Sequence, residues 1–278
     1  MWIGRPGALR QIADGAKSFD RSPDLRVSEF VSLEGGVTTW APPVRPRRLK
    51  LSWDAMQRAD VAHLDRLARR IEGPGPIAVL DPLARNLLAA DQAAGLGPVG
   101  GKWATSTGVI TLYGGSTGSA VPNTVSVDAL HTTGLAELVW RHPVFYGVPV
   151  TPGQTWTWWT PGLVASGAPM LSARVAWYDA GRKWISASAA GALGTPLVAV
   201  APANAAYVWP HVAFTAKGVW DLGTSVLALG DVSEALMAGD RPMGDGCPAM
   251  SITRYSEQAT PGDGAFRNVG MELVEVTG

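Results

Sequence analysis

Residues 45–88 read RPRRLKLSWDAMQRADVAHLDRLARRIEGPGPIAVLDPLARNLL and decide the fold. Polar and apolar residues alternate over 47–53, which predicts a half-buried edge strand. Residues 60–71 place apolar side chains every three or four positions, which predicts an amphipathic helix. The Gly-Pro-Gly-Pro run at 73–76 ends that helix, and 77–80 is predicted as a buried strand. The rest of the chain has the pattern of β-structure, so we expect a mainly β fold with one packed helix.

The predicted helix has recognisable ends. Asp60 is a good N-cap residue, and Gly73 stands where a C-cap belongs. Its apolar face consists of Val61, Leu64, Leu67, Ala68 and Ile71. We expect His63, which has Asp60, Arg66 and Arg70 around it, to be solvated.

Many short strands separated by turns fill the rest of the sequence. Before residue 45, Glu34-Gly35-Gly36-Val37 predicts a hairpin turn after strands at 24–27 and 30–33. Between 108 and 229 the strand spacing is typical of a sandwich or jelly roll. Glycine-rich segments at 89–101 and 238–246 are predicted linkers. We therefore expect a domain that begins in 1–101, is interrupted by a jelly-roll sandwich at 102–246 and closes with a β-hairpin in 247–278.

Charge and cysteine content narrow the possible functions. The 278-residue chain has 23 basic and 23 acidic side chains, and a neutral chain gives no reason to expect nucleic acid as a partner. Cys247 is its single cysteine, which excludes an intrachain disulfide and predicts a small buried residue. No stretch approaches the roughly 18 apolar residues of a membrane span, and the first residues lack the apolar core of a signal peptide. We expect a protein made in the cytoplasm, without membrane insertion.

The middle segment is rich in tryptophan, with nine of the twelve lying in 103–245. Trp156 and Trp158 share one face of a predicted strand, and Trp159 lies on the other. Trp177 and Tyr178 point to opposite faces of another strand, so one of them should be exposed. The candidates for stacking on a sugar ring are Trp159, Trp177, Tyr178, Trp184 and Trp209. Packing in the core is the alternative for each, and the sequence leaves it open.

Chemistry-bearing motifs are absent. The histidines His63, His131, His142 and His211 show no two-ligand spacing, so we expect neither metal nor cofactor. Most carboxylates of the middle segment fall in predicted turns or linkers, and no Gly-x-Ser-x-Gly elbow occurs. We expect that the protein is not an enzyme.

Two parts of the chain resemble known families. The stretch 45–88, with Leu49-Lys50-Leu51-Ser52-Trp53 and Gly75-Pro76-Ile77-Ala78-Val79-Leu80-Asp81-Pro82, and the closing strand 266–276 resemble distal tail and minor tail proteins of long-tailed (siphovirus-type) phages. Residues 150–159, 176–179 and 201–207 resemble a carbohydrate-binding jelly roll. Together the resemblance covers most of the chain. It implies a tail-type β-sandwich or split barrel interrupted by an inserted sugar-binding-type sandwich.

The resemblance also implies a place and partners. The protein would be a virion component of the tail tip, a homo-hexameric ring that joins the tail tube to neighbouring tip proteins, with a sandwich that contacts host-surface glycans. Arginine is enriched at subunit interfaces, so the candidate interface residues are Arg47, Arg48, Arg66, Arg69 and Arg70. The alternative function is a stand-alone carbohydrate-binding protein without catalysis.

Overall fold

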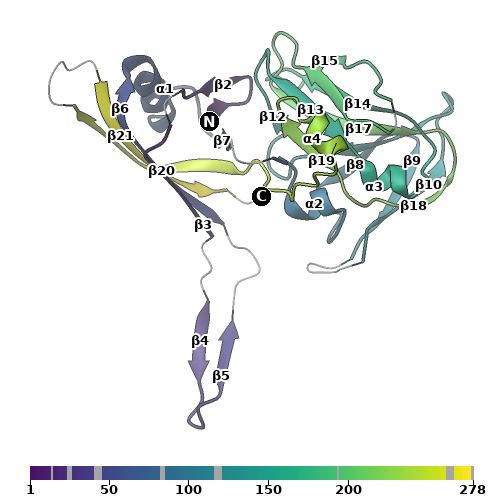
Figure 1. Ribbon diagram of the computed structural model, residues 1–278, viewed down its shortest axis with the longest axis horizontal. Helices are drawn as coiled ribbons and strands as arrows, with labels where there is room; N and C mark the ends of the chain where they lie inside the picture. Colours follow the sequence, from purple (N-terminus) through teal and green to yellow (C-terminus); the bar gives the residue numbers. More distant parts are fainter. Residues whose placement is uncertain are drawn as a thin grey trace. The chain divides into compact units, whose positions relative to one another are not determined.

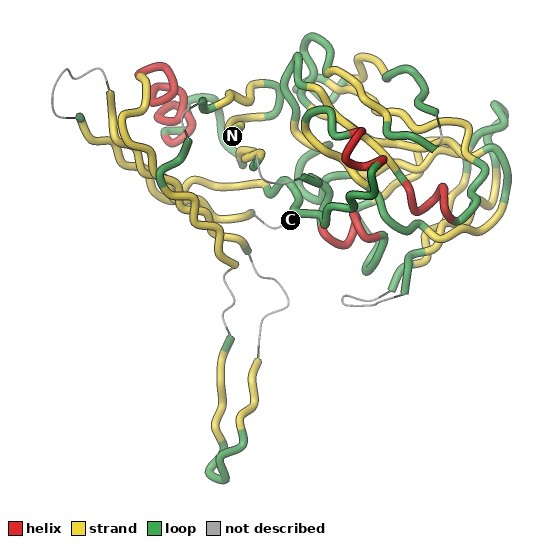
Figure 2. The backbone as a smooth tube through the Cα atoms, viewed as in Figure 1, coloured by secondary structure: helices red, strands yellow, loops and turns green. Residues whose placement is uncertain are grey.

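Strand β6 (Arg47–Gln57) runs directly into helix α1 (Arg58–Ala68), and strand β7 (Ile77–Leu80) follows (Figure 1). The computed structural model describes residues 1–13, 15–23, 27–40, 46–81, 85–115, 121–192, 194–260 and 266–276. Residues 24–26 of a predicted strand, residue 45 and residues 82–84 therefore lie outside it. Strands dominate and helices are few and short (Figure 2), so the predicted mainly β fold class is confirmed.

The chain divides into two compact units. Unit 1 comprises Met1 and residues 10–79 and 248–278, and unit 2 comprises residues 2–9 and 80–247. Unit 1 is therefore discontinuous in sequence, with unit 2 between its two main segments. This division differs from the expected boundary at 101, because residues 80–101 group with unit 2.

Unit 1 is built on antiparallel strands in the order β7-β20-β21-β6-β3, with β3 at Ser18–Pro23, β20 at Ala249–Ala259 and β21 at Phe266–Glu275. Trp53 of β6 lies opposite Val269 of β21, and Leu51 lies opposite Met271. All four side chains are buried, and α1 packs on β6, β20 and β21. The alternation in 47–53 thus marks the face that α1 covers. The prediction of an edge strand was wrong, because β6 lies between β21 and β3.

Helix α1 differs from the prediction at both ends. Its N-cap is Gln57, and Asp60 lies inside the first turn, where the Nε of Arg10 donates a 2.6 Å hydrogen bond to its Oδ1. The helix ends before Gly73, because Arg70 adopts a left-handed φ of 56°. A non-glycine residue thus makes the left-handed turn that the sequence assigned to glycine.

The buried face of α1 is broader than predicted. Val61, Leu64 and Leu67 are buried, as expected, but Ile71 lies beyond the helix and is 64 % exposed. His63 is buried, so the expectation of a solvated histidine was wrong. The reason is geometric, since His63 lies four residues before Leu67 and so borders the apolar face of α1.

A second hairpin in unit 1 consists of β4 (Ser28–Val31) and β5 (Val37–Trp40). The turn predicted at 34–37 lies where the two strands join, which confirms the hairpin. In the described part of the chain these strands pair only with each other.

Unit 2 is a β-sandwich of antiparallel sheets. One layer has the order β15-β14-β17-β11-β8, with β12 also paired to β17, and the sheets β16-β13-β19 and β18-β10-β9 contact it. The strands are β8 (Trp103–Thr107), β9 (Val109–Tyr113), β10 (Thr124–Ala129), β11 (Ala136–Trp140), β12 (Val148–Pro149), β13 (Thr155–Trp159), β14 (Met170–Tyr178), β15 (Trp184–Ala187), β16 (Leu197–Val200), β17 (Tyr207–Phe214), β18 (Gly218–Asp221) and β19 (Val226–Leu229).

Aromatic contacts join the layers of unit 2. Trp140 of β11 meets Trp158 of β13 edge to face, with ring centroids 4.9 Å apart. Phe214 of β17 stacks on Trp220 of β18 at 5.8 Å.

The N-terminal strands β1 (Trp2–Arg5) and β2 (Ala8–Gln11) enclose Gly7, whose backbone N–H donates to the carbonyl of Val150 at 2.7 Å. This hydrogen bond holds the N-terminal turn on the sandwich.

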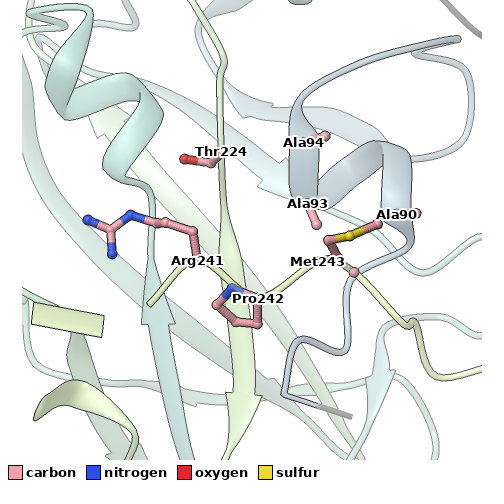
Figure 3. A pocket seen from close by; sticks show the side chains of 8 residues that line it. Ala90, Ala93, Ala94, Thr224, Arg241, Pro242 and Met243 are labelled. Atoms are coloured by element: carbon pink, nitrogen blue, oxygen red, sulfur yellow. The ribbon is translucent and has the colours of Figure 1, made fainter. Parts of the chain in front are cut away.

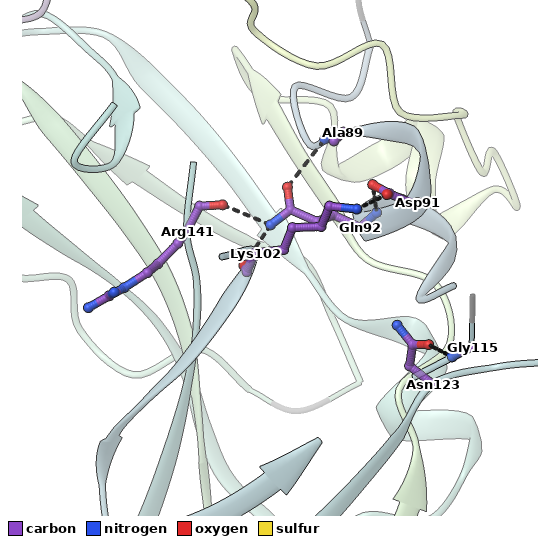
Figure 4. Close-up of polar contacts among 7 residues, drawn as sticks. All are labelled: Ala89, Asp91, Gln92, Lys102, Gly115, Asn123 and Arg141. Carbon is purple, nitrogen blue, oxygen red and sulfur yellow. Dashed lines mark hydrogen bonds and ion pairs between the residues drawn. The ribbon is translucent and has the colours of Figure 1, made fainter. Parts of the chain in front are cut away.

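The segment predicted as a linker at 89–101 is an integral part of unit 2. It contains α2 (Ala90–Ala94); the other one-turn helices are α3 (Pro161–Ala165) and α4 (Ser233–Met237). Gln92 donates from its side chain to the backbone carbonyls of Lys102 and Arg141, at 2.7 and 2.8 Å, and the Lys102 ammonium pairs with Asp91 (Figure 4). A Cβ on Gly95 would lie 2.2 Å from the carbonyl oxygen of Gly223. Glycine-rich composition here reflects close packing rather than a linker.

Candidate functional site

The structure separates the five aromatic residues proposed for sugar stacking. Trp177 lies in the sandwich interior, opposite Val208 of β17, and is 2 % exposed. Trp159 packs with Leu236 of α4 in a buried cluster. Trp184 is 58 % exposed on β15. Only Tyr178 and Trp209 come together, with ring centroids 4.8 Å apart.

Tyr178 and Trp209 lie on the outer face of the β14-β17-β11 layer. Along β17, Val208 and Val212 are fully buried, so the alternate residues Tyr207, Trp209 and His211 face outward. Tyr178 lies directly opposite Tyr207 in the β14–β17 register. Antiparallel pairing therefore gathers residues from two distant strands on one surface.

A fourth aromatic residue completes this surface. Tyr146 comes from the segment between β11 and β12, and its ring centroid lies 5.3 Å from Tyr178, 5.7 Å from Tyr207 and 4.7 Å from Trp209. We call Tyr146, Tyr178, Tyr207 and Trp209 the aromatic patch. The three tyrosines are partly exposed, and no hydrogen bond joins their hydroxyl groups to another described residue. Their hydroxyl groups are thus available to solvent or to a ligand.

Two arginines cover the aromatic patch. The guanidinium carbon of Arg141 lies 5.0 Å from the centroid of the Trp209 ring, and that of Arg182 lies 5.7 Å from the centroid of Tyr146. Both arginines are exposed, and in the described chain no carboxylate lies within ion-pair distance of either. Stacking on aromatic rings holds a guanidinium in place while its N–H groups stay free.

The segment that carries Arg141 and Tyr146 is fixed by buried polar groups. His142 contacts the backbone carbonyl of Cys247 through Nε2 at 2.6 Å, and its Nδ1 accepts hydrogen bonds from the backbone N–H groups of Val144 and Phe145. Cys247 itself is buried, as predicted. The aromatic patch is therefore built on an ordered loop as well as on strands.

A polar row continues the same face. His211 lies opposite Arg174 of β14 and Val139 of β11, with Glu137 two residues before Val139. Burial lowers the pKa of His211; Glu137 opposes this shift and Arg174 adds to it. Burial raises the pKa of Tyr178 and of Tyr207, so both phenols stay neutral well above physiological pH. The charge of this face at neutral pH therefore comes from its arginines and Glu137.

Unit 2 also contains a small apolar pocket of about 140 Å³ between α2 and residues 241–244 (Figure 3). Arg241 lines it, but its guanidinium lies 4.6 Å from the Trp159 ring and donates to the carbonyl of Leu236. Figure 3 labels Thr224, Met243 and the alanines of α2 as other lining residues. None of these side chains is an acid or a base at neutral pH, so the pocket has no group for acid–base catalysis.

The five candidate interface arginines lie on two elements of unit 1. Arg47 and Arg48 belong to β6, and Arg47 binds the carboxylate of Glu275 through Nε at 3.1 Å. The others lie at or after the end of α1. Arg69 pairs with Asp65 at 2.8 Å and Arg66 with Glu72 at 3.3 Å, and Arg70 has the left-handed φ noted above.

Sequence reasoning missed Tyr146, Tyr207, Arg141 and Arg182. Tyr146 and Arg141 lie in a segment without strand periodicity. The run of basic and aromatic residues in Arg141-His142-Pro143-Val144-Phe145-Tyr146, between two predicted strands, was the pattern that could have pointed to them. In the part of the chain that the structure describes, no cluster of three or more potential metal ligands occurs. No described helix is long and apolar enough to span a bilayer.

Comparison with known proteins gives no family assignment. Neither the protein-family models nor the curated proteins that were searched contain a match to this chain.

Proposed function

We propose that this protein is a non-catalytic structural component of a phage tail tip. Unit 1 assembles copies of the chain into a ring, a hexamer by the resemblance noted above, which joins the tail tube to neighbouring tip proteins in the virion. Unit 2 is an accessory sandwich that contacts glycans on the host surface. The observation that carries the proposal is the β4–β5 hairpin of unit 1.

The β4–β5 hairpin leaves large apolar side chains in solvent. Every residue from Val27 to Trp40 is exposed. The exposed fraction is 62 % for Phe30, 57 % for Trp40, and 69 and 62 % for Val31 and Val37. An isolated two-stranded hairpin is only marginally stable in water, so a hairpin of this composition requires a partner.

The register shows that both faces of the hairpin are apolar. Phe30 lies opposite Thr38, and Ser28 opposite Trp40, so Phe30 and Trp40 share one face. Val31 lies opposite Val37 on the other face. A hairpin that is apolar on both faces fits between two surfaces rather than on one. Neighbouring subunits of a closed ring provide two such surfaces for every copy.

The way unit 1 is assembled from the chain also supports a tail-tip subunit. The strands of unit 1 come from both ends of the chain, with α1 packed on them and unit 2 inserted between β7 and β20. This arrangement agrees with a tail-type domain that carries an insertion, as the resemblance implies. The aromatic patch also favours the alternative, a stand-alone carbohydrate-binding protein, which would remain a monomer.

The mass of the purified protein in solution tests the proposal. We expect light scattering to give about six chains per particle and negative-stain images to show rings. The double variants Phe30→Thr/Trp40→Thr and Val31→Thr/Val37→Thr keep strand-forming side chains but remove the apolar surface of one face each. Both should reduce the mass towards that of one chain.

The matched control is Val109→Thr/Val219→Thr, because these valines are 52 and 63 % exposed on strands of unit 2. This control should assemble like the wild type. If the wild type has the mass of one chain at every concentration, or if both hairpin variants still form rings, self-assembly through the hairpin is wrong.

A further inference from the structure

We propose that the aromatic patch of unit 2 binds acidic polysaccharides, with Arg141 and Arg182 pairing with the carboxylates of uronic acid residues. This inference rests on the proposed function, in which unit 2 contacts glycans, and it names the chemical class of the glycan and the residues that select it.

The covered rings argue against a neutral sugar. A neutral pyranose binds mainly by laying its C–H face on an exposed aromatic ring. Trp209 is only 9 % exposed, and Arg141 lies over its ring. Arg182 lies over the ring of Tyr146 in the same way. At Trp209 and Tyr146, a ligand therefore meets a guanidinium ion before it meets the aromatic ring.

The guanidinium groups of Arg141 and Arg182 are available to bind an anion. Within the described residues neither Arg141 nor Arg182 has a carboxylate partner, so binding an anion breaks no internal ion pair. Asp179, the nearest acid to Arg182 in sequence, accepts a hydrogen bond from the backbone N–H of Lys183. Guanidinium groups bind carboxylates through two parallel hydrogen bonds, and their stacking on the rings reduces the entropy lost on binding.

Tyrosine hydroxyl groups supply the contacts that a sugar needs besides its charge. The ring centroid of Tyr146 lies 5.3 Å from that of Tyr178 and 5.7 Å from that of Tyr207. The three hydroxyl groups make no hydrogen bond to another described residue. Burial raises the pKa of Tyr178 and of Tyr207, so both of these phenols are protonated at neutral pH. Neutral phenols donate to and accept from sugar hydroxyl groups. Two cations around three phenols therefore match a chain of hydroxylated, carboxylated rings.

Two polymers with the same backbone and different charge test the inference. Polygalacturonate carries one carboxylate per sugar, and its methyl-esterified form has the same rings without the charge. Hyaluronan is a second uronate polymer with different linkages. We expect calorimetric titration of the intact protein to show binding to polygalacturonate or hyaluronan at least about tenfold tighter than to the ester. That affinity should fall as salt is added.

Matched variants identify the binding groups. Arg141→Gln/Arg182→Gln should weaken uronate binding by about tenfold or more. Arg141→Lys/Arg182→Lys should lose less affinity, because lysine keeps the positive charge but cannot form the two parallel hydrogen bonds of a guanidinium group. The control Lys217→Gln/Arg254→Gln removes the same charge from exposed residues that do not belong to the patch and should change the affinity less than about twofold. An unchanged melting temperature shows that each variant is folded.

Several results overturn the inference. The first is equal affinity for the charged and the esterified polymer. The second is no binding of either uronate polymer at millimolar uronate. The third is a loss of affinity in the control variant as large as in Arg141→Gln/Arg182→Gln. The mass measurement separates this inference from the proposed function. Rings that fail to bind uronate overturn the inference alone, whereas a monomer that binds uronate through both arginines supports it and overturns the ring.

Discussion

The indole nitrogen of Trp209 donates a 2.6 Å hydrogen bond to the backbone carbonyl of Tyr146. This bond ties the segment between β11 and β12 to the outer face of β17. Gly147 allows the approach, because a Cβ there would lie 2.5 Å from Cδ1 of the Trp209 ring. Together with His142, Trp209 thus holds the loop that carries Tyr146 of the aromatic patch and Arg141, which lies over it.

Replacing Trp209 by Phe keeps an aromatic ring but removes the hydrogen-bond donor. We expect Trp209→Phe to lower the free energy of unfolding of unit 2 by about 1–3 kcal/mol, because the Tyr146 carbonyl loses its donor. Denaturant unfolding followed by near-ultraviolet circular dichroism measures the change. Trp184→Phe is the control, since Trp184 is 58 % exposed, and it should stay within about 0.5 kcal/mol of the wild type.

The contact between Trp140 and Trp158 joins the two layers of the sandwich. Both side chains are at most 1 % exposed, so truncation leaves a cavity that the surroundings can fill only in part. We expect Trp158→Ala to destabilise unit 2 by about 3–5 kcal/mol. A chemical denaturation curve that matches that of Trp184→Ala would contradict a role of this pair in holding the layers together.

The sequence allowed the local elements to be predicted, because their signals lie within a few residues. The β6–α1–β7 order and the β4–β5 turn follow from alternation, helical spacing and glycine. The opposite faces of Trp156 and Trp159 also follow from strand geometry. Alternation along a strand does not show which face of the sheet is covered. Trp159 was therefore kept among the candidates for sugar binding, although it packs with Leu236.

The aromatic patch could not be predicted for a different reason. Tyr178 and Tyr207 are neighbours only because β14 and β17 pair in one particular register, and no pattern within either strand contains that register. Tyr146 joins them from an irregular segment whose position depends on His142 and Trp209. The burial of His63 was likewise a matter of tertiary packing, since the helix presents a wider stripe to its sheet than the apolar spacing alone indicated.

We expect His211 to make unit 2 sensitive to acid. Burial lowers its pKa below the ordinary 6.5, so the folded state binds the proton more weakly than the unfolded chain does. The resulting stability is fully present above about pH 6.5 and is lost as the pH falls towards the lowered pKa. We expect the melting temperature of unit 2 to fall between about pH 7 and pH 5.

His211→Phe tests whether His211 causes this sensitivity. The variant keeps a ring of similar size at the same outward position of β17 but cannot take up a proton. Its melting temperature should depend less on pH over that interval than that of the wild type. The comparison variant His131→Phe changes an exposed histidine and should leave the wild-type pH dependence intact. Equal pH profiles for wild type and His211→Phe would assign the acid sensitivity to other groups.

The discontinuity of unit 1 predicts the outcome of two deletions. Ala78 of β7 lies opposite Ala249 of β20, so the chain ends left by removing residues 80–247 are already neighbours in an antiparallel pair. An Asn-Gly turn joining Val79 to Pro248 should therefore restore a hairpin, and the remaining chain should unfold cooperatively with the circular dichroism of a helix on a sheet. In contrast, β21 lies between β20 and β6 and supplies Val269, Met271 and Leu273 to the face under α1. Removing residues 266–278 should abolish the cooperative unfolding of unit 1, and two deletions of equal stability would show that β21 is not an interior strand of its fold.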